Sequence, residues 1–266
     1  KAYVLCRVAD LHCLRRARQA GVQGRPELMA KANQVRVAEY RGALQADAAL
    51  THSEAEAAQL RKDLPQAIVH VVPWATPAAS TSFTSHDRNG LLFIGNYAHA
   101  PNSDAVQWLV HDIMPAVWAM DPTITCTLVG AEMPDSIHAL ASDRIRVLGH
   151  VQNLDSVLNQ ARLSVAPLRF GAGIKGKVLE SLSAGVPCIM TPVAAEGLAL
   201  PKSLRGLVQS TTQDMAQQIV ALHSARTLSG IIEAGQTYTS ATFSEDAVTT
   251  ALGMALERKV TLQAAG

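Results

Sequence analysis

The chain has 266 residues, of which 48% are hydrophobic and 17% charged, so it can bury a substantial core and is not expected to be disordered. Its 23 lysines and arginines nearly balance 22 aspartates and glutamates, and the net charge of +1 gives no broad field to attract nucleic acid or anionic lipid. No apolar stretch approaches the roughly 18 residues of a membrane span, and the N-terminus lacks a signal-peptide layout, so the sequence predicts a globular cytoplasmic protein without a membrane span or a nucleic-acid partner.

The first 76 residues indicate part of a parallel α/β domain. A strand is predicted at 2–8, a long polar helical stretch runs to about Leu44, and a further helix ends near Leu60. The runs DAALTHS and AIVHVV supply two more strands. A doubly wound domain normally has five or six strands, so we expect residues 1–76 to form a partial, truncated Rossmann-like domain with an open sheet edge. A second copy in a homo-oligomer, another chain or a missing N-terminal segment is expected to cover that edge.

Residues 77–90 have the Ser, Thr and Pro content of a linker. Beyond them, at 91–240, the apolar runs LLFIG, ITCTLVG, IRVLG, LSVAP and PCIMT alternate with helical spacing. This alternation predicts a doubly wound parallel Rossmann-like domain, in which Trp108 and Trp118 are expected to pack against the core. Residues 241–266 are predicted to form a C-terminal helix and tail. The fold class is therefore α/β, with a partial Rossmann-like domain followed by a complete one.

A glycine-rich loop between a predicted strand and a predicted helix is the most informative segment. Gly171, Gly173 and Gly176 fit the pattern G-x-G-x-x-G, and Gly171 through Lys177 fit G-x-x-x-x-G-K. Glycines let the backbone approach a ligand, and the free amides and dipole of the following helix favour an anion. Lys175 or Lys177 would add the charge that tight phosphate binding needs. The loop therefore predicts a phosphate site.

Neither of the two common phosphate motifs fits the loop completely. A Walker loop needs Ser or Thr after the lysine to hold magnesium, but Val178 stands there. A dinucleotide fingerprint needs its first glycine in a tight turn at the strand end, whereas three residues separate Pro167 from Gly171. Both interpretations are disfavoured. An ordinary surface contact between Lys177 and Glu180, one helical turn apart, also remains open.

A third pattern combines Lys177-x-x-Glu180 with the segment S-A-G-V-P that closes the helix. The whole run PLRFGAGIKGKVLESLSAGVP resembles the donor-binding segment of the retaining glycosyltransferases of family 4, the group 1 transferases with two facing Rossmann-like domains called GT-B. The likeness extends to FIGN at 93–96, LVG at 128–130, GHV at 149–151 and AEG at 195–197. VADLHCLRRARQAG and ADAALTHSEAEAAQL resemble the end of that family's acceptor domain, so the resemblance covers the chain from about 2 to 200.

The resemblance implies roles for particular residues. Glu180 would accept hydrogen bonds from the ribose of a nucleotide-diphosphate sugar, and Lys177 with the helix N-terminus would hold the diphosphate and stabilise it as it leaves. The other positions expected to bind the donor are Gly95, Asn96, Val151, Arg169, Gly171, Ala172, Gly173, Ile174, Lys175, Gly176 and Val178. For Gly95 and Asn96, an ordinary strand-ending turn is the competing interpretation.

The family often carries a first glutamate, in contact with the sugar, eight positions before the second. Ala172 stands at that place. The sugar is then expected to be held by the backbone of 171–174 or by other side chains such as Arg169. Asp10 and His12 follow the first strand, at the sheet edge where open α/β folds bind ligands, and are expected to face the acceptor. With Lys177 they form the predicted catalytic set, although a lone histidine is more often a local hydrogen-bonding residue.

The predicted function is transfer of a sugar, with retention, from a nucleotide-diphosphate sugar to a carbohydrate or lipid-linked acceptor. No D-x-D, H-x-H or H-E-x-x-H pattern occurs, so we expect no metal site and no cofactor beyond the donor itself. A non-catalytic nucleotide-sugar-binding module, an NAD-dependent oxidoreductase and a GT-B epimerase acting on a nucleotide sugar remain alternatives.

Overall fold

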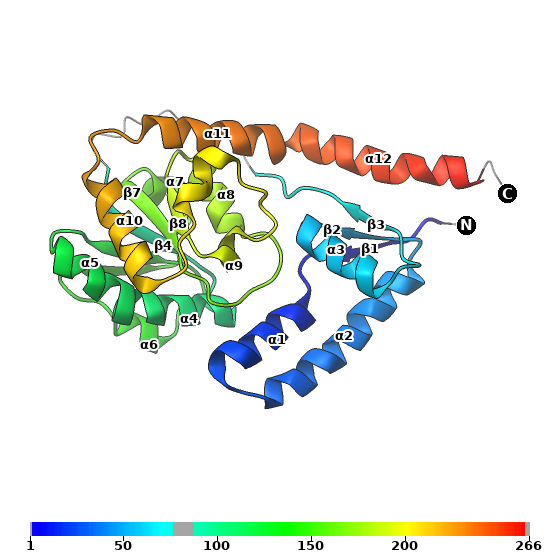
Figure 1. Cartoon of the computed structure of the whole chain (residues 1–266), viewed down its shortest axis with the longest axis horizontal. Coiled ribbons are helices and arrows are strands. Elements are labelled where there is room, and N and C mark those ends of the chain that lie inside the picture. Colours follow the sequence, from blue (N-terminus) through cyan, green and yellow to red (C-terminus); the bar gives the residue numbers. More distant parts are fainter. Residues whose placement is uncertain (1, 77–87, 264–266) are drawn as a thin grey trace.

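The computed structural model describes residues 2–76 and 88–263, with side chains through Leu256 (Figure 1). Most of the linker predicted at 77–90 lies outside the described residues. We call residues 2–76 the N-terminal unit and residues 88–242 the C-terminal unit. Each is built around a parallel β-sheet, so the predicted α/β class is confirmed. No helix among the described residues is long and apolar enough to cross a membrane.

The N-terminal unit holds a three-stranded sheet of order β1-β2-β3. Its elements are β1 (Leu5–Val8), α1 (His12–Gln23), α2 (Glu27–Gln45), β2 (Ala48–Thr51), α3 (Glu54–Asp63) and β3 (Val69–Val71). Within the described residues β1 pairs only with β2, so its other edge is open as expected, and what covers that edge stays a prediction.

Two predicted elements of the N-terminal unit were wrong in extent. The strand placed at 2–8 begins only at Leu5; at Val4 the amide donates to the Asp47 side chain, while the carbonyl accepts from the amides of Asp47 and Ala48. The single helical stretch to about Leu44 is two antiparallel helices. Gly24 ends α1 in the left-handed conformation, with φ of 62°, and Pro26 follows before α2. A left-handed glycine directs the chain away from the helix axis, so the helix cannot continue through it.

The C-terminal unit holds a five-stranded parallel sheet of order β6-β5-β4-β7-β8. Its strands are β4 (Asn89–Ile94), β5 (Cys126–Val129), β6 (Ile145–Gly149), β7 (Ala161–Ala166) and β8 (Cys188–Met190). The helices that connect them are α4 (Ala100–Trp108), α5 (Met114–Met120), α6 (Asp135–His138), α7 (Asp155–Leu158) and α8 (Gly176–Ser183). A π-helical turn at Leu109–Ile113 joins α4 to α5. β4 begins at Asn89, inside the segment predicted as linker.

The last part of the chain is helical. It comprises α9 (Pro192–Ala195), a 3-10 helix at Lys202–Leu207, α10 (Thr212–Ser224), α11 (Ser229–Thr242) and α12 (Glu245–Gln263). In Figure 1, α12 extends away from the C-terminal unit, and the amide of Thr76 hydrogen-bonds to the carbonyl of Phe243 just before it. The helix of the segment predicted as C-terminal helix and tail continues through Gln263, and residues 264–266 lie outside the described ones.

The two units have separate apolar cores. In the C-terminal unit, Phe93, Leu128 and Leu163 of adjacent strands are fully buried. Trp108 and Trp118 pack against this core, as predicted, and each indole N–H has a partner, the hydroxyl of Thr212 and the carbonyl of Ile124. The core of the N-terminal unit is smaller and contains residues between 6 and 71. Burial of these side chains fixes the positions of the strands. The loops that follow the strands are thereby held at the edge of each sheet.

Candidate functional site

The strand order places the predicted donor residues at one edge of the C-terminal sheet. The chain runs outward from β4 through β5 to β6 and then returns to add β7 and β8 on the other side of β4. β4 and β7 are therefore paired neighbours, with Leu91 opposite Leu163. Open α/β sheets bind ligands at the carboxyl ends of the strands where the order reverses in this way. The loops after β4 and β7 contain most of the predicted donor residues.

The loop after β4 is a closely packed turn. Gly95 donates to the Val129 carbonyl, and a Cβ at Gly130 would lie 1.5 Å from the Gly95 carbonyl oxygen, so the turns after β4 and β5 touch. The Asn96 side chain accepts from the Ala98 amide. The side chain of Asn96 therefore closes a turn, which supports the interpretation of Gly95 and Asn96 as an ordinary strand-ending turn. A contact between the donor and the backbone of Asn96 stays a prediction.

We call residues 167–175, between β7 and α8, the donor loop, after the role that the sequence predicts for them. The Lys175 amine donates to the carbonyls of Ala172 and Gly173, at 3.0 and 2.5 Å. Burial lowers the pKa of Lys175 to about 8, against the opposing charges of Glu196 and Glu56. Lys175 therefore shapes the bend of its own loop, and its amine does not stand free for a ligand.

Lys177 lies in the first turn of α8. Its amine is 2.5 Å from the Asn102 side-chain oxygen and 4.4 Å from the centre of the Phe93 ring, which brings it to the carboxyl end of β4. Burial lowers the pKa of Lys177 to about 7. The Lys177 amine therefore lies where the amino end of α8 meets the turn after β4.

Glu180 follows one turn later on α8. Burial raises the pKa of its carboxyl group, and the charge of Lys177 opposes that shift. Lys177 binds Asn102 rather than Glu180, so the simple surface pair is not formed. Among the residues with described side chains, none donates a hydrogen bond to the Glu180 carboxylate. Its oxygens remain available to a ligand.

The other predicted donor side chains are engaged within the protein. Arg169 forms two hydrogen bonds with Asp104 on α4. The predicted contact of its side chain with the donor sugar would require this ion pair to separate. Val178 is fully buried, and Val151 and Ile174 pack against apolar clusters. The Val178 amide donates to the Lys175 carbonyl. At Gly171 and Gly176 a Cβ would meet Lys175 Cε at 3.1 Å and Glu180 Oε1 at 3.9 Å, so Gly171 is the tighter position.

Asp10 lies against the donor loop from the N-terminal unit, and His12 contacts Asp10. A Cβ at Gly173 would be 2.8 Å from the Asp10 Cβ, so the two turns are in direct contact. The Asp10 carboxylate contacts His12 Nε2 and accepts from Arg15, each at 2.7 Å. His12 is half exposed and its other ring nitrogen is 3.5 Å from Glu39. The structure brings the predicted acceptor edge to the donor loop, while the catalytic roles stay predictions.

Two residues that the sequence analysis did not assign, Arg18 and Glu56, join the units. Arg18 binds both oxygens of Glu196, at 2.6 and 2.7 Å, and also donates to the Gly171 carbonyl. Glu56 accepts from the Gly173 amide at 2.9 Å. The one local signal was the spacing Ser53-x-x-Glu56, which is typical of a helix start and does not by itself indicate a contact between units.

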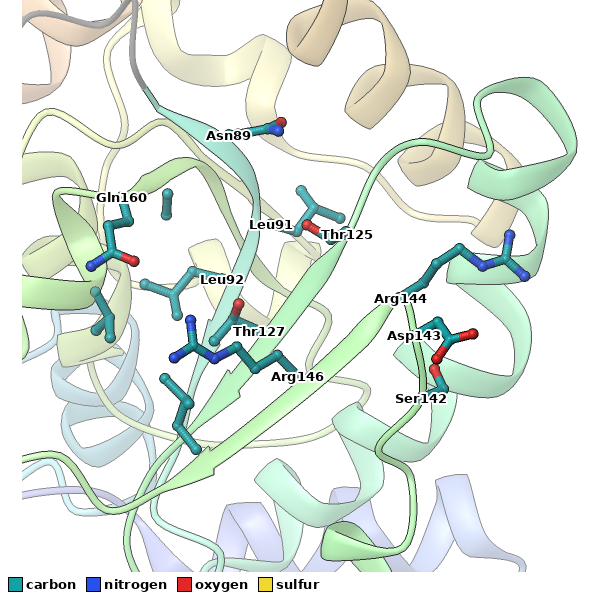
Figure 2. Close-up of a pocket in the computed structure, with 13 residues that line it drawn as sticks. Asn89, Leu91, Leu92, Thr125, Thr127, Ser142, Asp143, Arg144, Arg146 and Gln160 are labelled. Carbon is teal, nitrogen blue, oxygen red and sulfur yellow. The ribbon is translucent and has the colours of Figure 1, made fainter.

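A hollow of about 450 Å³ lies at the opposite edge of the same sheet (Figure 2). Its walls include Asn89 and Ala161, the first residues of β4 and β7, and Thr125 just before β5. Leu92 and Thr127 from within the strands also line it, and the Arg146 side chain reaches across the sheet face. The hollow extends from the amino ends of the strands over one face of the sheet, and no residue of the donor loop lines it. The hollow is therefore separate from the predicted site. Among the described residues, no group of three or more His, Cys, Asp or Glu side chains is arranged to hold a metal ion.

Two facing parallel α/β units with the ligand edge between them define the GT-B class of fold. A family model described as "Glycosyl transferases group 1" matches residues 88–225, slightly more than half of the chain. The chain belongs to this family. A search of curated proteins found no match.

Solved structures share the fold at low sequence identity. Sucrose-phosphate synthase from Thermosynechococcus elongatus has a TM-score of 0.73 and 20% identity, over 98% of this chain and 68% of that one. Anabaena HepE, solved with UDP and glucose, has a TM-score of 0.74 and 12% identity, over 96% and 71%. A Staphylococcus aureus TarM mutant, in a complex that includes UDP, has a TM-score of 0.69 and 11% identity, over 82% and 45%. The present chain thus spans about half the length of TarM.

Proposed function

We propose that this chain carries the donor site of a glycosyltransferase that moves a sugar from a nucleotide-diphosphate sugar to a carbohydrate or lipid-linked acceptor, with retention and without a metal ion. The observation that supports this most directly is the position of Lys177, at the amino end of α8 and the carboxyl end of β4, with an open Glu180 one turn later. A diphosphate at the helix start and a ribose at Glu180 fit this spacing.

The electrostatics favour a departing diphosphate. A nucleoside diphosphate gains negative charge as the glycosidic bond breaks, and fixed donors at that place stabilise the transition state. The helix dipole contributes about 0.3 to 1 kcal/mol at an exposed site. A bound anion also favours the charged form of Lys177, whose pKa burial has lowered to about 7. This cation and the helix terminus support a mechanism in which the protein itself neutralises the leaving group.

The proposed acceptor lies beside the contact between the donor loop and the turn of Asp10. The contact of Asp10 with Gly173, and of His12 with Asp10, brings two acid-base groups of the N-terminal unit toward the proposed sugar position. Retention follows from the resemblance of residues 163–197 to the retaining family. UDP is the first nucleotide to test, because it is named in the complexes of TarM and HepE.

Glu180→Ala tests the donor site. Two hydrogen bonds to a charged acceptor contribute about 1.5 to 3 kcal/mol each, so we expect nucleoside-diphosphate affinity to fall at least tenfold. Calorimetric titration with UDP, GDP and dTDP in the presence of a chelator measures the change. Glu233→Ala, at an exposed position on α11, is the matched control and should bind as the unmodified chain does. Equal affinities of the two variants would exclude the proposed ribose contact.

A non-catalytic nucleotide-sugar-binding module is the second candidate. The pairing of Arg169 with Asp104 is compatible with it, because this side chain is not free to hold a sugar. The two candidates differ in turnover. A transferase releases nucleoside diphosphate from its donor when the acceptor is present, whereas a binding module holds the donor unchanged, and a chromatographic assay of the nucleotide separates them. NADH in the same binding panel tests the oxidoreductase alternative.

A further inference from the structure

A buried carboxylate of the N-terminal unit is bound to the donor loop. One oxygen of Glu56 accepts from the amides of Leu11 and Gly173, at 2.8 and 2.9 Å, and the other accepts from the Thr51 hydroxyl. The residue is 1% exposed. Burial raises the pKa of its carboxyl group, and the three donors oppose that shift. Because an unpaired buried carboxylate is strongly unfavourable, these donors hold Glu56 in place.

The helix that carries Glu56 does not use it as a cap. Ser53 begins α3 and its hydroxyl accepts from the Glu56 amide, so the first half of a capping box is present. In the complete box the glutamate would accept from the Ser53 amide. Here that amide donates instead to the Thr51 hydroxyl. The carboxylate is thereby left to bind one amide of its own unit and one of the donor loop.

The donor loop depends on this contact for its shape. Gly173 has a φ of 68°, in the left-handed region, and its Cα lies so close to the Asp10 turn that a Cβ would be 3.1 Å from the Ala9 carbonyl oxygen. Lys175 binds the carbonyls of Ala172 and Gly173, which lie on either side of the Gly173 Cα. Ala172 itself brings no polar side chain to the bend. The carboxylate that holds the bend comes from the other unit.

We propose that Glu56 is a positioning residue of the donor site, which holds the Gly173 amide so that the donor loop keeps the bend needed for the diphosphate and the sugar. The predicted effect of Glu56 on donor binding rests on the proposed function. Its predicted effect on the conformation of the donor loop does not. Glu56 also makes the donor loop dependent on the N-terminal unit.

Three variants test the proposal. Glu56→Ala removes the acceptor and leaves two buried amides without a partner. Glu56→Gln keeps an oxygen for both amides, and its NH2 group can donate to the Thr51 hydroxyl. Ala57→Gly, at the next buried position, weakens α3 without touching the donor loop contacts. In amide hydrogen exchange without ligand, we expect exchange of the peptide covering 169–178 to rise about tenfold or more in Glu56→Ala only. Equal exchange in Glu56→Ala and Ala57→Gly would overturn the proposal.

UDP titration of the same variants tests the effect on the donor. We expect affinity to fall about tenfold in Glu56→Ala and to be retained in Glu56→Gln and Ala57→Gly. If the loop loosens in Glu56→Ala while UDP affinity is unchanged, the link to the donor site is wrong. If the unmodified chain binds none of the nucleoside diphosphates, the proposed function fails, and the exchange experiment still decides whether Glu56 positions the loop.

Discussion

Lys175 and Lys177 lie two positions apart, but their amines have different surroundings. Lys175 donates to carbonyls of the donor loop, whereas Lys177 lies over the Phe93 ring with one polar partner, Asn102. An aromatic face favours the charged amine but cannot accept as many hydrogen bonds as water does. Lys177 is therefore the lysine whose charge depends most on the arrival of an anion. The sequence placed both lysines at the helix start and could not separate these roles.

Lys177→Met should change how stability depends on pH. The folded-state pKa of Lys177, about 7, lies below the roughly 10.4 of an unfolded chain, so between these values the unfolded state binds more protons and stability rises with pH. The variant loses this contribution. Urea unfolding at about pH 7 and about pH 8.5 should show a smaller rise than in the unmodified chain. Lys202→Met, at an exposed position, is the control; if both variants keep the full rise, Lys177 is not the group responsible.

At the scale of elements, the donor loop is set by a backbone conformation that a side chain rarely adopts. We expect Gly173→Ala to lower the free energy of unfolding by at least about 1 kcal/mol, because a left-handed φ costs about 1 to 2 kcal/mol for other residues and the new Cβ would meet Asp10 at 2.8 Å. Gly21→Ala, inside α1 with no atom within 4 Å of the new Cβ, should instead raise stability by about 0.5 to 1 kcal/mol. Urea denaturation measures both, and changes of the same sign would contradict the argument.

The elements that the sequence predicted correctly are those with a local cause. Apolar runs such as LLFIG and LSVAP become β4 and β7 because burial on both faces of a parallel sheet requires continuous hydrophobic sequence. The start of α8 was predicted because the glycines at 171, 173 and 176 mark a loop directly before a helical pattern. The break at Gly24 was missed because the polar pattern continues across it. The bond between Glu56 and Gly173 was missed because the two residues are far apart in sequence and only the tertiary fold joins them.

At the scale of the whole molecule, the ion pair of Arg18 and Glu196 should control how closely the units approach. Both side chains are about one-third exposed, and pairs of this kind contribute on the order of 1 kcal/mol or less. We expect Arg18→Ala to increase the radius of gyration measured by small-angle X-ray scattering, because Glu196 and the Gly171 carbonyl lose their partner. High salt should also increase the radius of gyration of the unmodified chain, because it screens this ion pair.

Arg61→Ala provides the comparison for that experiment. Arg61 pairs with Glu54 entirely within the N-terminal unit. Its removal changes charge by the same amount but breaks no contact between units. A radius of gyration that responds equally to both substitutions would show that net charge, rather than the pair of Arg18 and Glu196, sets the distance.

The separation of the two apolar cores has a thermal consequence. In the described part of the chain, one buried cluster lies between 6 and 71 and the others between 91 and 243. The hydrogen bonds and the ion pair that join the units are polar. Exposing apolar surface raises heat capacity, whereas exposing polar groups lowers it slightly. Parting of the units therefore has an enthalpy that varies little as the protein warms, in contrast to the melting of either core.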